Sequence, residues 1–485
     1  MAVPTLRLVP LNDVPADPHG RFVLYWMTAC RRATFNPALD HAINLAVANR
    51  RPLLVIEALG TRYRWACDRF HRFVLDGMTD NQRAFASTPA TYACWLGRGE
   101  RDEGAADFAS VAQQAVAVVL DDAPAGFQRP LNRALAARCT VQVVAVDGNG
   151  VMPLRAATEL KQRAVDYRRV VQRSLAPHLL QMPAEKPFAG VSLPALDWLP
   201  TFAADPATCD LAALPIDHTV GPVALRGGTT AARAHLSTFM ASRYARYDRG
   251  RNDVEDSAAS GLSPWLHFGH LSTHEVCSAV FSKEHWSIDH IIERKVTGSK
   301  EGWWGMSAPG EALLDQLLVW RELGFHFCHH VPDHTSYEGL PAWARTTLGC
   351  HAADPRPHRY DLAELAAAQT HDAVWNAAQT QLVREGVMHN YLRMLWAKKV
   401  LEWSASPAAA LAVLIELNNR YALDGRDPNS YTGIMWTLGR FDRPWAPERA
   451  IFGSIRYMSS DSARRKLDLD DYLARYAAAP QTSFL

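Results

Sequence analysis

The first 150 residues alternate between short apolar runs and longer amphipathic stretches. The apolar runs are rich in β-branched or aromatic residues and are bounded by turn residues, which is typical of buried strands; they cover 22–27, 53–58, 91–96, 116–120 and 141–146. Between them, apolar residues recur at helical spacing over 38–48, 66–84, 105–114 and 130–137. This exchange of strand and helix predicts a doubly wound parallel α/β sheet with helices on both faces.

The pattern changes after residue 150. A helical stretch is followed by a segment in which seven prolines recur from 177 to 215, and this predicts a helix and an interdomain linker. No convincing strand pattern comes later, and helical spacing occurs over 230–247, 272–282, 312–327, 362–385, 390–403 and 407–419. We therefore expect a Rossmann-like α/β domain over 1–150, a helix and linker over 151–226, and an all-helical domain over 227–485.

The composition fits a globular protein of several domains. Of 485 residues, 48% are hydrophobic and 21% are charged, and the net charge of +1 excludes nucleic-acid binding through overall basic charge. No apolar run reaches the ~18 residues of a membrane span, and residues 1–20 carry prolines and acids where a signal peptide has an apolar core. The eight cysteines form no CxxC pair, so we expect a cytoplasmic protein with reduced thiols.

A proline-containing helix start is the first segment with candidate chemistry. Residues 257–272 read SAASGLSPWLHFGHLS, and Ser263 precedes Pro264 where an N-cap residue is expected. The segment is either an ordinary capped helix or an anion site, because free N–H groups and serine hydroxyls at a helix start suit a phosphate.

Tryptophans are frequent, with 15 in the chain, and two of them share a predicted helix face. Trp396 and Trp403 are seven residues apart in GVMHNYLRMLWAKKVLEW, and Trp375 is placed to lie alongside on the preceding helix. The three side chains are either core residues or a chain of oxidisable rings between a buried cofactor and solvent. Arg393, on the same apolar-rich helix, needs a carboxylate partner if it is buried.

Candidate partners for that arginine occur in the turn DGRDPN. Asp424, Asp427 and Asn429 make this segment either a polar surface turn or a group of carboxylates and amides offered to a heterocyclic cofactor. The following stretch, 440–466, interleaves arginines with aromatic residues. That pattern suits either a solvated charged face or phosphate contacts combined with base stacking.

Other cofactor motifs are absent from the sequence. It has neither GxGxxG nor GxxxxGK[ST], so a dinucleotide fingerprint and a P-loop are not expected. His326 and His330 are four residues apart in FHFCHHVPDH, but no HExxH and no matching second Cys/His group accompanies them. We therefore expect no metal site.

In combination, these segments resemble the photolyase/cryptochrome family, most closely the class II cyclobutane pyrimidine dimer photolyases and their bacterial relatives. The resemblance covers residues 21–476 and is strongest from 260 onward, where six motifs follow in order: GLSPWLHFGHLS, VWREL, HDAVWNAAQ, MHNYLRMLWAKKVLEW, YALDGRDPNSY and DRPWAPERAIFGSIRYM. It implies an antenna-type α/β N-terminal domain, an all-α FAD-binding domain, and UV-damaged DNA bound over the mouth of the FAD site. We expect a monomer without a membrane partner.

Matched residue by residue, the resemblance implies a set of FAD contacts. The residues that match contacts with the phosphates and the ribityl chain are Tyr247, Ser260, Leu262 and Ser263. Those that match contacts with the isoalloxazine ring are the ion pair Arg393 and Asp424, then Asp427, and Asn418 beside flavin N5. The match to the class II photoreduction chain is Trp396 nearest the flavin, followed by Trp375 and Trp403.

The resemblance also implies a lesion site and DNA contacts. Trp320 and Trp436 match its aromatic walls, with Met394 beneath the lesion. Arg443 and Trp445 match the pair that fills the gap left in the duplex, and Arg456 matches a nearby contact to the lesion or its backbone. Gln316 stands where the family often has a glutamate; an amide can hydrogen-bond a pyrimidine carbonyl but cannot donate a proton as a carboxylic acid can.

The implied activity is that of a deoxyribodipyrimidine photo-lyase, a carbon–carbon lyase. Excited FADH⁻ donates an electron to a flipped-out cyclobutane dimer, the ring opens, and the electron returns. Two alternatives stay open: a cryptochrome-like blue-light photoreceptor, and a photolyase for (6-4) lesions, since those enzymes use a glutamine in a place comparable to Gln316. The stretch TACRRATFNPAL departs from the family's usual sequence, so a second, antenna chromophore stays unassigned.

Overall fold

The computed structural model describes residues 2–477, so residue 1 and the end of the predicted helical domain, 478–485, lie outside the described residues. A six-stranded sheet forms the centre of the N-terminal domain, with the order β1-β6-β5-β2-β3-β4. The strands are β1 (Leu8–Pro10), β2 (Phe22–Met27), β3 (Leu53–Leu59), β4 (Thr91–Leu96), β5 (Ala115–Asp121) and β6 (Gln142–Val146). Five are parallel, as predicted, and β1 adds an antiparallel edge beside β6 that the sequence analysis missed.

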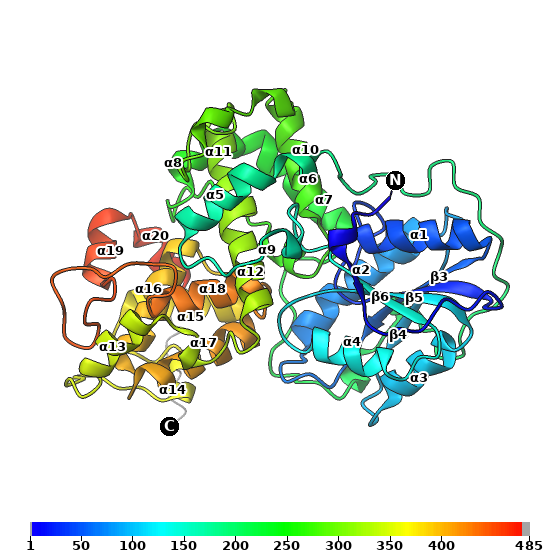
Figure 1. Ribbon diagram of the computed structural model, residues 1–485. Helices are drawn as coiled ribbons and strands as arrows, with labels where there is room; N and C mark the ends of the chain where they lie inside the picture. Colours follow the sequence, from blue (N-terminus) through cyan, green and yellow to red (C-terminus); the bar gives the residue numbers. More distant parts are fainter. Residues whose placement is uncertain (1, 478–485) are drawn as a thin grey trace.

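Helices cover both faces of this sheet (Figure 1). They are α1 (Pro37–Asn49), α2 (Asp68–Phe85), α3 (Glu103–Ala112) and α4 (Gln128–Ala136). Alternate residues of β2 point to opposite cores: Tyr25 packs in the same cluster as residues of α1, and Trp26 packs in the cluster with residues of α3 and α4. Because the central strands are buried on both sides, they are apolar apart from the buried Glu57 of β3 and Asp121 of β5, and this explains why the sequence identified them.

The rest of the described chain is largely helical and contains no further strand, apart from isolated bridges. The helices that follow the sheet are α5 (Ala164–Ser174), α6 (Ala176–Leu179), α7 (Thr229–Ser242), α8 (Tyr247–Gly250), α9 (Ser263–His267), α10 (Thr273–Lys283), α11 (Ala308–Leu314), α12 (Glu322–His330), α13 (Ala342–Cys350), α14 (Leu362–Ala366), α15 (Ala373–Glu385), α16 (Asn390–Trp403), α17 (Pro407–Tyr421), α18 (Pro428–Thr437), α19 (Ser460–Lys466) and α20 (Asp470–Arg475). The predicted fold, a parallel α/β sheet followed by a helical domain, is therefore confirmed. Within the described residues, no helix is both long and apolar enough to cross a membrane.

The proline-rich segment between α6 and α7 runs along the N-terminal sheet domain (Figure 1). Phe188 and Leu193 pack against the core on the α1 side of the sheet, whereas Trp198 and Phe202 pack against the core on the opposite side. The segment therefore covers apolar surface of the sheet domain on its way to the helical part. The boundaries at 150 and 226 stay a prediction.

Three segments predicted as single helices are interrupted. Residues 230–247 form α7, a 3-10 turn and α8; residues 312–327 contain a π-helical segment, η8 (Asp315–Arg321), between α11 and α12. Residues 362–385 divide into α14 and α15, because Ala368 adopts a positive φ of 56° and Asp372 accepts hydrogen bonds from the N–H groups of Val374 and Trp375. Hydrophobic periodicity cannot detect such breaks when both sides keep the same spacing.

Buried charged side chains join the two halves of the molecule. Arg69 on α2 donates to the carbonyl oxygens of Tyr421 and Val383 at 2.6 Å each. Glu322 on α12 accepts a hydrogen bond from the N–H of Val151 at 2.7 Å, and burial raises the pKa of its carboxyl to about 7. These contacts fix the sheet domain against the helices that carry the site.

Candidate functional site

A hydrogen-bonded group of three side chains brings α9 and α16 together with the turn before α18. The Arg393 guanidinium donates to an Asp424 carboxylate oxygen at 3.0 Å, and the Ser263 hydroxyl donates to the other oxygen at 2.7 Å. The carboxylate partner expected for Arg393 is therefore present, 31 residues further along the chain. Burial works against the charge on Asp424, but Arg393, the Ser263 hydroxyl and His267 together outweigh it and lower the pKa of this carboxyl, so the ion pair persists at neutral pH.

One local prediction about this group is wrong. Ser263 is not the N-cap of α9; it is the first helical residue, Leu262 is the N-cap, and no side chain caps the helix. The Ser263 hydroxyl is instead used by Asp424. The uncapped first turn leaves backbone N–H groups without an intrahelical partner.

The two carboxylates of the DGRDPN segment are largely buried in this site. The side chains of Asp424 and Asp427 are 13% and 10% exposed. Asp427 accepts from the N–H of Asn429 and so caps α18, and its other oxygen lies 3.3 Å from Nδ1 of His267 on α9. Burial lowers the pKa of His267, although Asp427 opposes this shift. Asn429, by contrast, is exposed, so only the two carboxylates of the turn face the interior.

The remaining residues matched to the cofactor are buried or half-buried. Asn418 is buried on α17 and donates to the Ser430 hydroxyl at 2.6 Å. Tyr247 and Leu262 are both buried, and the carbonyl oxygen of Ser260 lies 2.8 Å from Nε2 of His235. Within the described residues, no hydrogen bond joins Tyr247, Leu262 or the Ser260 side chain to the Ser263–Asp424–Arg393 group.

The three predicted tryptophans form one continuous chain of ring contacts. The rings of Trp396 and Trp375 are nearly parallel, with centroids 6.3 Å apart and an interplanar angle of 8°. Trp375 then meets Trp403 edge to face at 5.5 Å. Trp396 lies on α16 three residues after Arg393, so these contacts begin beside the ion pair and lead away from it. This arrangement is compatible with electron transfer and equally with a packed core, so the redox role stays a prediction.

A second group combines cations and indoles near the end of α18. The Arg443 guanidinium lies 4.6 Å from the Trp445 ring, and Arg456 lies 4.9 Å from Trp445 and 5.7 Å from Trp436. Both arginines are exposed, whereas both tryptophans are half-buried. The structure thus places the residues matched to DNA contacts directly beside one residue matched to a lesion wall.

The other residues matched to the lesion site lie on two elements that each pack against α18. Gln316 and Trp320 are half-buried on η8, and Met394 is half-buried on α16. π-Helical turns are rare and are frequently found at functional sites, because the extra residue per turn re-aims the side chains. No sequence signal that we used predicted this local conformation.

The sequence analysis did not identify two groups of residues that lie beside the site. Lys398 on α16 is fully buried; its ammonium donates to the Thr437 carbonyl at 2.6 Å and lies 5.0 Å from the Trp436 ring. Tyr360 and His371 cover Trp403, with ring centroids 5.2 and 5.5 Å away. The sequence could have indicated Lys398, because it follows Met394 by four residues and therefore lies on the same helix face.

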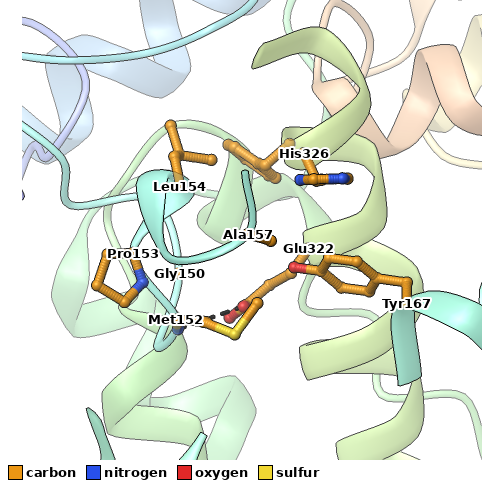
Figure 2. A pocket seen from close by; sticks show the side chains of 9 residues that line it. Gly150, Met152, Pro153, Leu154, Ala157, Tyr167, Glu322 and His326 are labelled. Carbon is orange, nitrogen blue, oxygen red and sulfur yellow. Dashed lines mark hydrogen bonds between the residues drawn. The ribbon is translucent and has the colours of Figure 1, made fainter. Parts of the chain in front are cut away.

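The cavity in Figure 2 shares no residue with these groups. It lies between residues 150–157 and α12, and Tyr167, Glu322 and His326 line it together with the backbone turn. Its volume of about 10 Å³ is that of a single water molecule. His326 and His330 each have Nε2 3.0 Å from a backbone carbonyl oxygen, and the described residues contain no group of three potential metal ligands.

Comparisons with known proteins define the family. No protein-family model matches the chain. A deoxyribodipyrimidine photo-lyase of Methanothermobacter thermautotrophicus is 33% identical over 470 residues, which cover 97% of this chain and 97% of that protein. A protein of the same name from Oryza sativa is 34% identical over 477 residues, covering 94% of this chain and 87% of that protein.

A solved structure agrees in fold. A bacterial class III photolyase from Agrobacterium tumefaciens superimposes with a TM-score of 0.69 at 18% identity, covering 96% of this chain and 88% of that one. This chain belongs to the deoxyribodipyrimidine photo-lyase family. Membership of that family implies a flavin chromophore.

Proposed function

We propose that this protein uses light to repair cyclobutane pyrimidine dimers in DNA, as a carbon–carbon lyase. Relatives with the name deoxyribodipyrimidine photo-lyase match almost the whole chain and support this activity. The structural observation that carries the proposal is the continuous contact from exposed Arg443 through Trp445 and Arg456 to Trp436. It connects a cationic, aromatic surface, which suits DNA, to a deeper indole that suits a base.

The surface group captures the damaged duplex. Arg443 and Arg456 contact backbone phosphates, and the Trp445 indole stacks where the lesion has left the helix. A dimer stacks and pairs poorly, so flipping it out costs less free energy than flipping normal bases. That difference gives selectivity for damage without any reading of base edges.

The flipped lesion then lies between aromatic side chains. Trp436 and Trp320 stack against it from α18 and η8, and Met394 packs beneath it from α16. Gln316 donates its amide N–H to a pyrimidine carbonyl and, unlike a carboxylic acid, supplies no proton. The side chains therefore hold the lesion and exclude water from it.

The residues present fit FAD as the flavin. Arg393 is a cation held in place by Asp424, whose pKa is lowered. The start of α9 has no side-chain cap, and such a helix start suits a phosphate. The residues that would hold the cofactor are Tyr247, Ser260, Leu262, Ser263, Arg393, Asn418, Asp424 and Asp427. When bound, the reduced flavin supplies and recovers the single electron that opens the cyclobutane ring. Trp396, Trp375 and Trp403 carry electrons toward that site from the far end of α16.

We further propose that the protein acts as a monomer in the cytoplasm. All eight cysteines are unpaired, which supports a reducing compartment. The photoreceptor alternative shares the flavin and the tryptophans but has no need of the Arg443–Trp445–Arg456–Trp436 group. Gln316 is the one observation that favours (6-4) lesions, and a direct comparison of the two lesions decides between them.

Binding in the dark tests the lesion site. The dissociation constant is measured for a duplex with one thymine dimer and for the undamaged duplex. Both are measured with wild type, with Trp436→Ala and with Trp198→Ala, a matched control in the N-terminal sheet domain. Loss of one stacking indole should weaken binding of the damaged duplex by about 5- to 150-fold, from the ~1–3 kcal/mol of a base–aromatic stack, and leave undamaged DNA unaffected. Equal losses for both duplexes, or no loss, would contradict the proposal.

A further inference from the structure

Two of the proposed DNA contacts lie at the two ends of one loop, the 445–456 loop. The Trp445 N–H donates to the Ser454 carbonyl oxygen at 2.8 Å, which closes the loop near its base. The Arg456 guanidinium lies 4.9 Å from the Trp445 ring, so the two side chains form one unit. The place of this unit therefore depends on what holds the loop.

The 445–456 loop lies beside α13 (Figure 1) and is hydrogen-bonded to it. The Ser454 N–H donates to the Thr347 hydroxyl at 2.9 Å, and the Ile451 N–H donates to an Asp354 carboxylate oxygen at 2.8 Å. The same Asp354 oxygen lies 2.6 Å from Nδ1 of His351, the residue that ends α13. The helix and the turn after it thus hold the loop backbone at two positions.

The backbone of the loop shows how close this contact is. Gly453 has a positive φ of 53°, and a Cβ atom there would overlap the Thr347 hydroxyl oxygen and the His351 ring. Ile451 also has a positive φ, of 70°. A β-branched residue rarely adopts that conformation, so it persists only where the surroundings hold it. The α13 side of the contact therefore fixes one conformation of the loop.

His351 lies between two carboxylates on different segments. Asp354 belongs to the turn after α13, whereas Glu448, with a carboxylate oxygen 3.7 Å from Nε2, belongs to the loop. Arg356 acts on Asp354 as a nearby cation. The hydrogen bond with Asp354 raises the pKa of His351, Glu448 adds to the shift, and desolvation opposes it. A protonated ring carries N–H groups toward both carboxylates, and a neutral ring can donate to only one.

We propose that Thr347, His351 and Asp354 position the 445–456 loop for damaged DNA, and that protonated His351 completes this contact. With the proton in place, His351 also joins Glu448 of the loop to α13. When the ring loses its proton, it keeps Asp354 and releases Glu448, so the first half of the loop is held less firmly. A loop that is already ordered loses less conformational entropy on binding, so the protonated protein binds damaged duplex more tightly. The inference rests on the proposed function, because it takes the loop to contact the duplex.

Gly453→Ala tests the position of the loop. The added Cβ does not fit against Thr347, so the loop moves away from α13 and Trp445 loses its place. The dissociation constant for a duplex with one thymine dimer should rise about tenfold, as expected for loss of one base–aromatic stack. Gly349→Ala is the matched control on α13 itself, because a Cβ atom there meets nothing within 4 Å, and it should bind as wild type does. Wild-type affinity in Gly453→Ala would overturn the inference.

His351→Gln tests the protonation step, because glutamine keeps an N–H for Asp354 and cannot become charged. From about pH 6 to 8.5 the wild-type dissociation constant should rise about threefold, as expected for loss of one exposed ion pair, and His351→Gln should lack this rise. Lys398 titrates in the same range but is present in both proteins, so its effect cancels in the comparison. His19→Gln, at an exposed position of the N-terminal sheet domain, is the control and should follow wild type. A wild-type pH profile in His351→Gln would overturn the inference.

Hydrogen exchange in the DNA-free protein separates this inference from the proposed function. The protection factors of the Ile451 and Ser454 amides should fall about threefold over the same pH range in wild type and stay constant in His351→Gln. Equal behaviour of the two proteins would overturn the inference. If wild type instead binds damaged and undamaged duplexes equally, the proposed function fails, and the exchange result still decides whether α13 holds the loop.

Discussion

Replacing Lys398 with methionine should remove one contribution to the pH dependence of the protein's free energy of unfolding. This side chain is fully buried, and burial lowers the pKa of its ammonium to about 7, with Arg456 lowering it further and Asp442 opposing the shift. The charged form donates to the Thr437 carbonyl and faces the Trp436 ring. Methionine has a similar volume and no charge, so the variant should fold.

The sign and size of the effect follow from the two pKa values. Between the folded value of about 7 and the ordinary value of 10.5, the unfolded side chain binds a proton that the folded one has released. The free energy of unfolding therefore rises with pH in this window, by up to about 1.36 kcal/mol per pH unit. Because half of the folded ammonium groups are already deprotonated near pH 7, the gain from about pH 7.0 to 8.5 is about 1.6 kcal/mol.

Urea unfolding at these two pH values measures the effect. The difference in free energy of unfolding between wild type and Lys398→Met should change by about 1.6 kcal/mol in favour of wild type as the pH rises. Lys466→Met, on an exposed position of α19, is the control and should keep the wild-type slope. If the free energy of unfolding changed equally with pH in wild type and in Lys398→Met, Lys398 would not be a buried ammonium with a lowered pKa, and the reasoning would be refuted.

Three further substitutions test separate parts of the site. Asp424→Asn should weaken flavin binding by about 2 kcal/mol, roughly thirtyfold, because Arg393 loses a charged hydrogen-bond partner; a flavin titration that matches wild type would contradict this role. Trp396→Phe should block photoreduction of the oxidised flavin yet leave repair by chemically reduced protein intact, and equal loss of both would mean that the electron path is misassigned. Arg443→Ala should weaken binding of damaged duplex and lower the slope of log K against log salt by about one, as expected for one phosphate contact; an unchanged slope would place Arg443 away from the DNA.

The fold was predictable because its signals are local. The strands β2 and β4 and the helix α16 have the predicted limits; the two strands are short apolar runs, and in α16 apolar residues recur at helical spacing. The strand β1 was missed because it has only three residues and ends in Pro10, which gives no period to detect. The breaks inside 362–385 were missed because a single N-cap at Asp372 restarts the helix without changing its spacing.

The site was predictable only in part. The need of Arg393 for a carboxylate followed from chemistry, and Asp424 meets it. The N-cap prediction for Ser263 failed because its hydroxyl bonds Asp424, which is 161 residues away. The contacts of Tyr360 with Trp403 and of Lys398 with Thr437 likewise join residues about 40 positions apart, and no local pattern encodes such pairings. The roles of the residues toward flavin and lesion came from family resemblance and stay predictions.

Light-dependent repair is the most direct test of the central claim. The chemically reduced protein is incubated with two oligonucleotides, one with a cyclobutane thymine dimer and one with a (6-4) photoproduct, under blue light and in darkness, and intact thymines are counted. The account predicts restoration of the cyclobutane substrate in light only, with the (6-4) substrate unchanged. Restoration of neither lesion by protein that has bound its flavin, or of the (6-4) lesion alone, would contradict it.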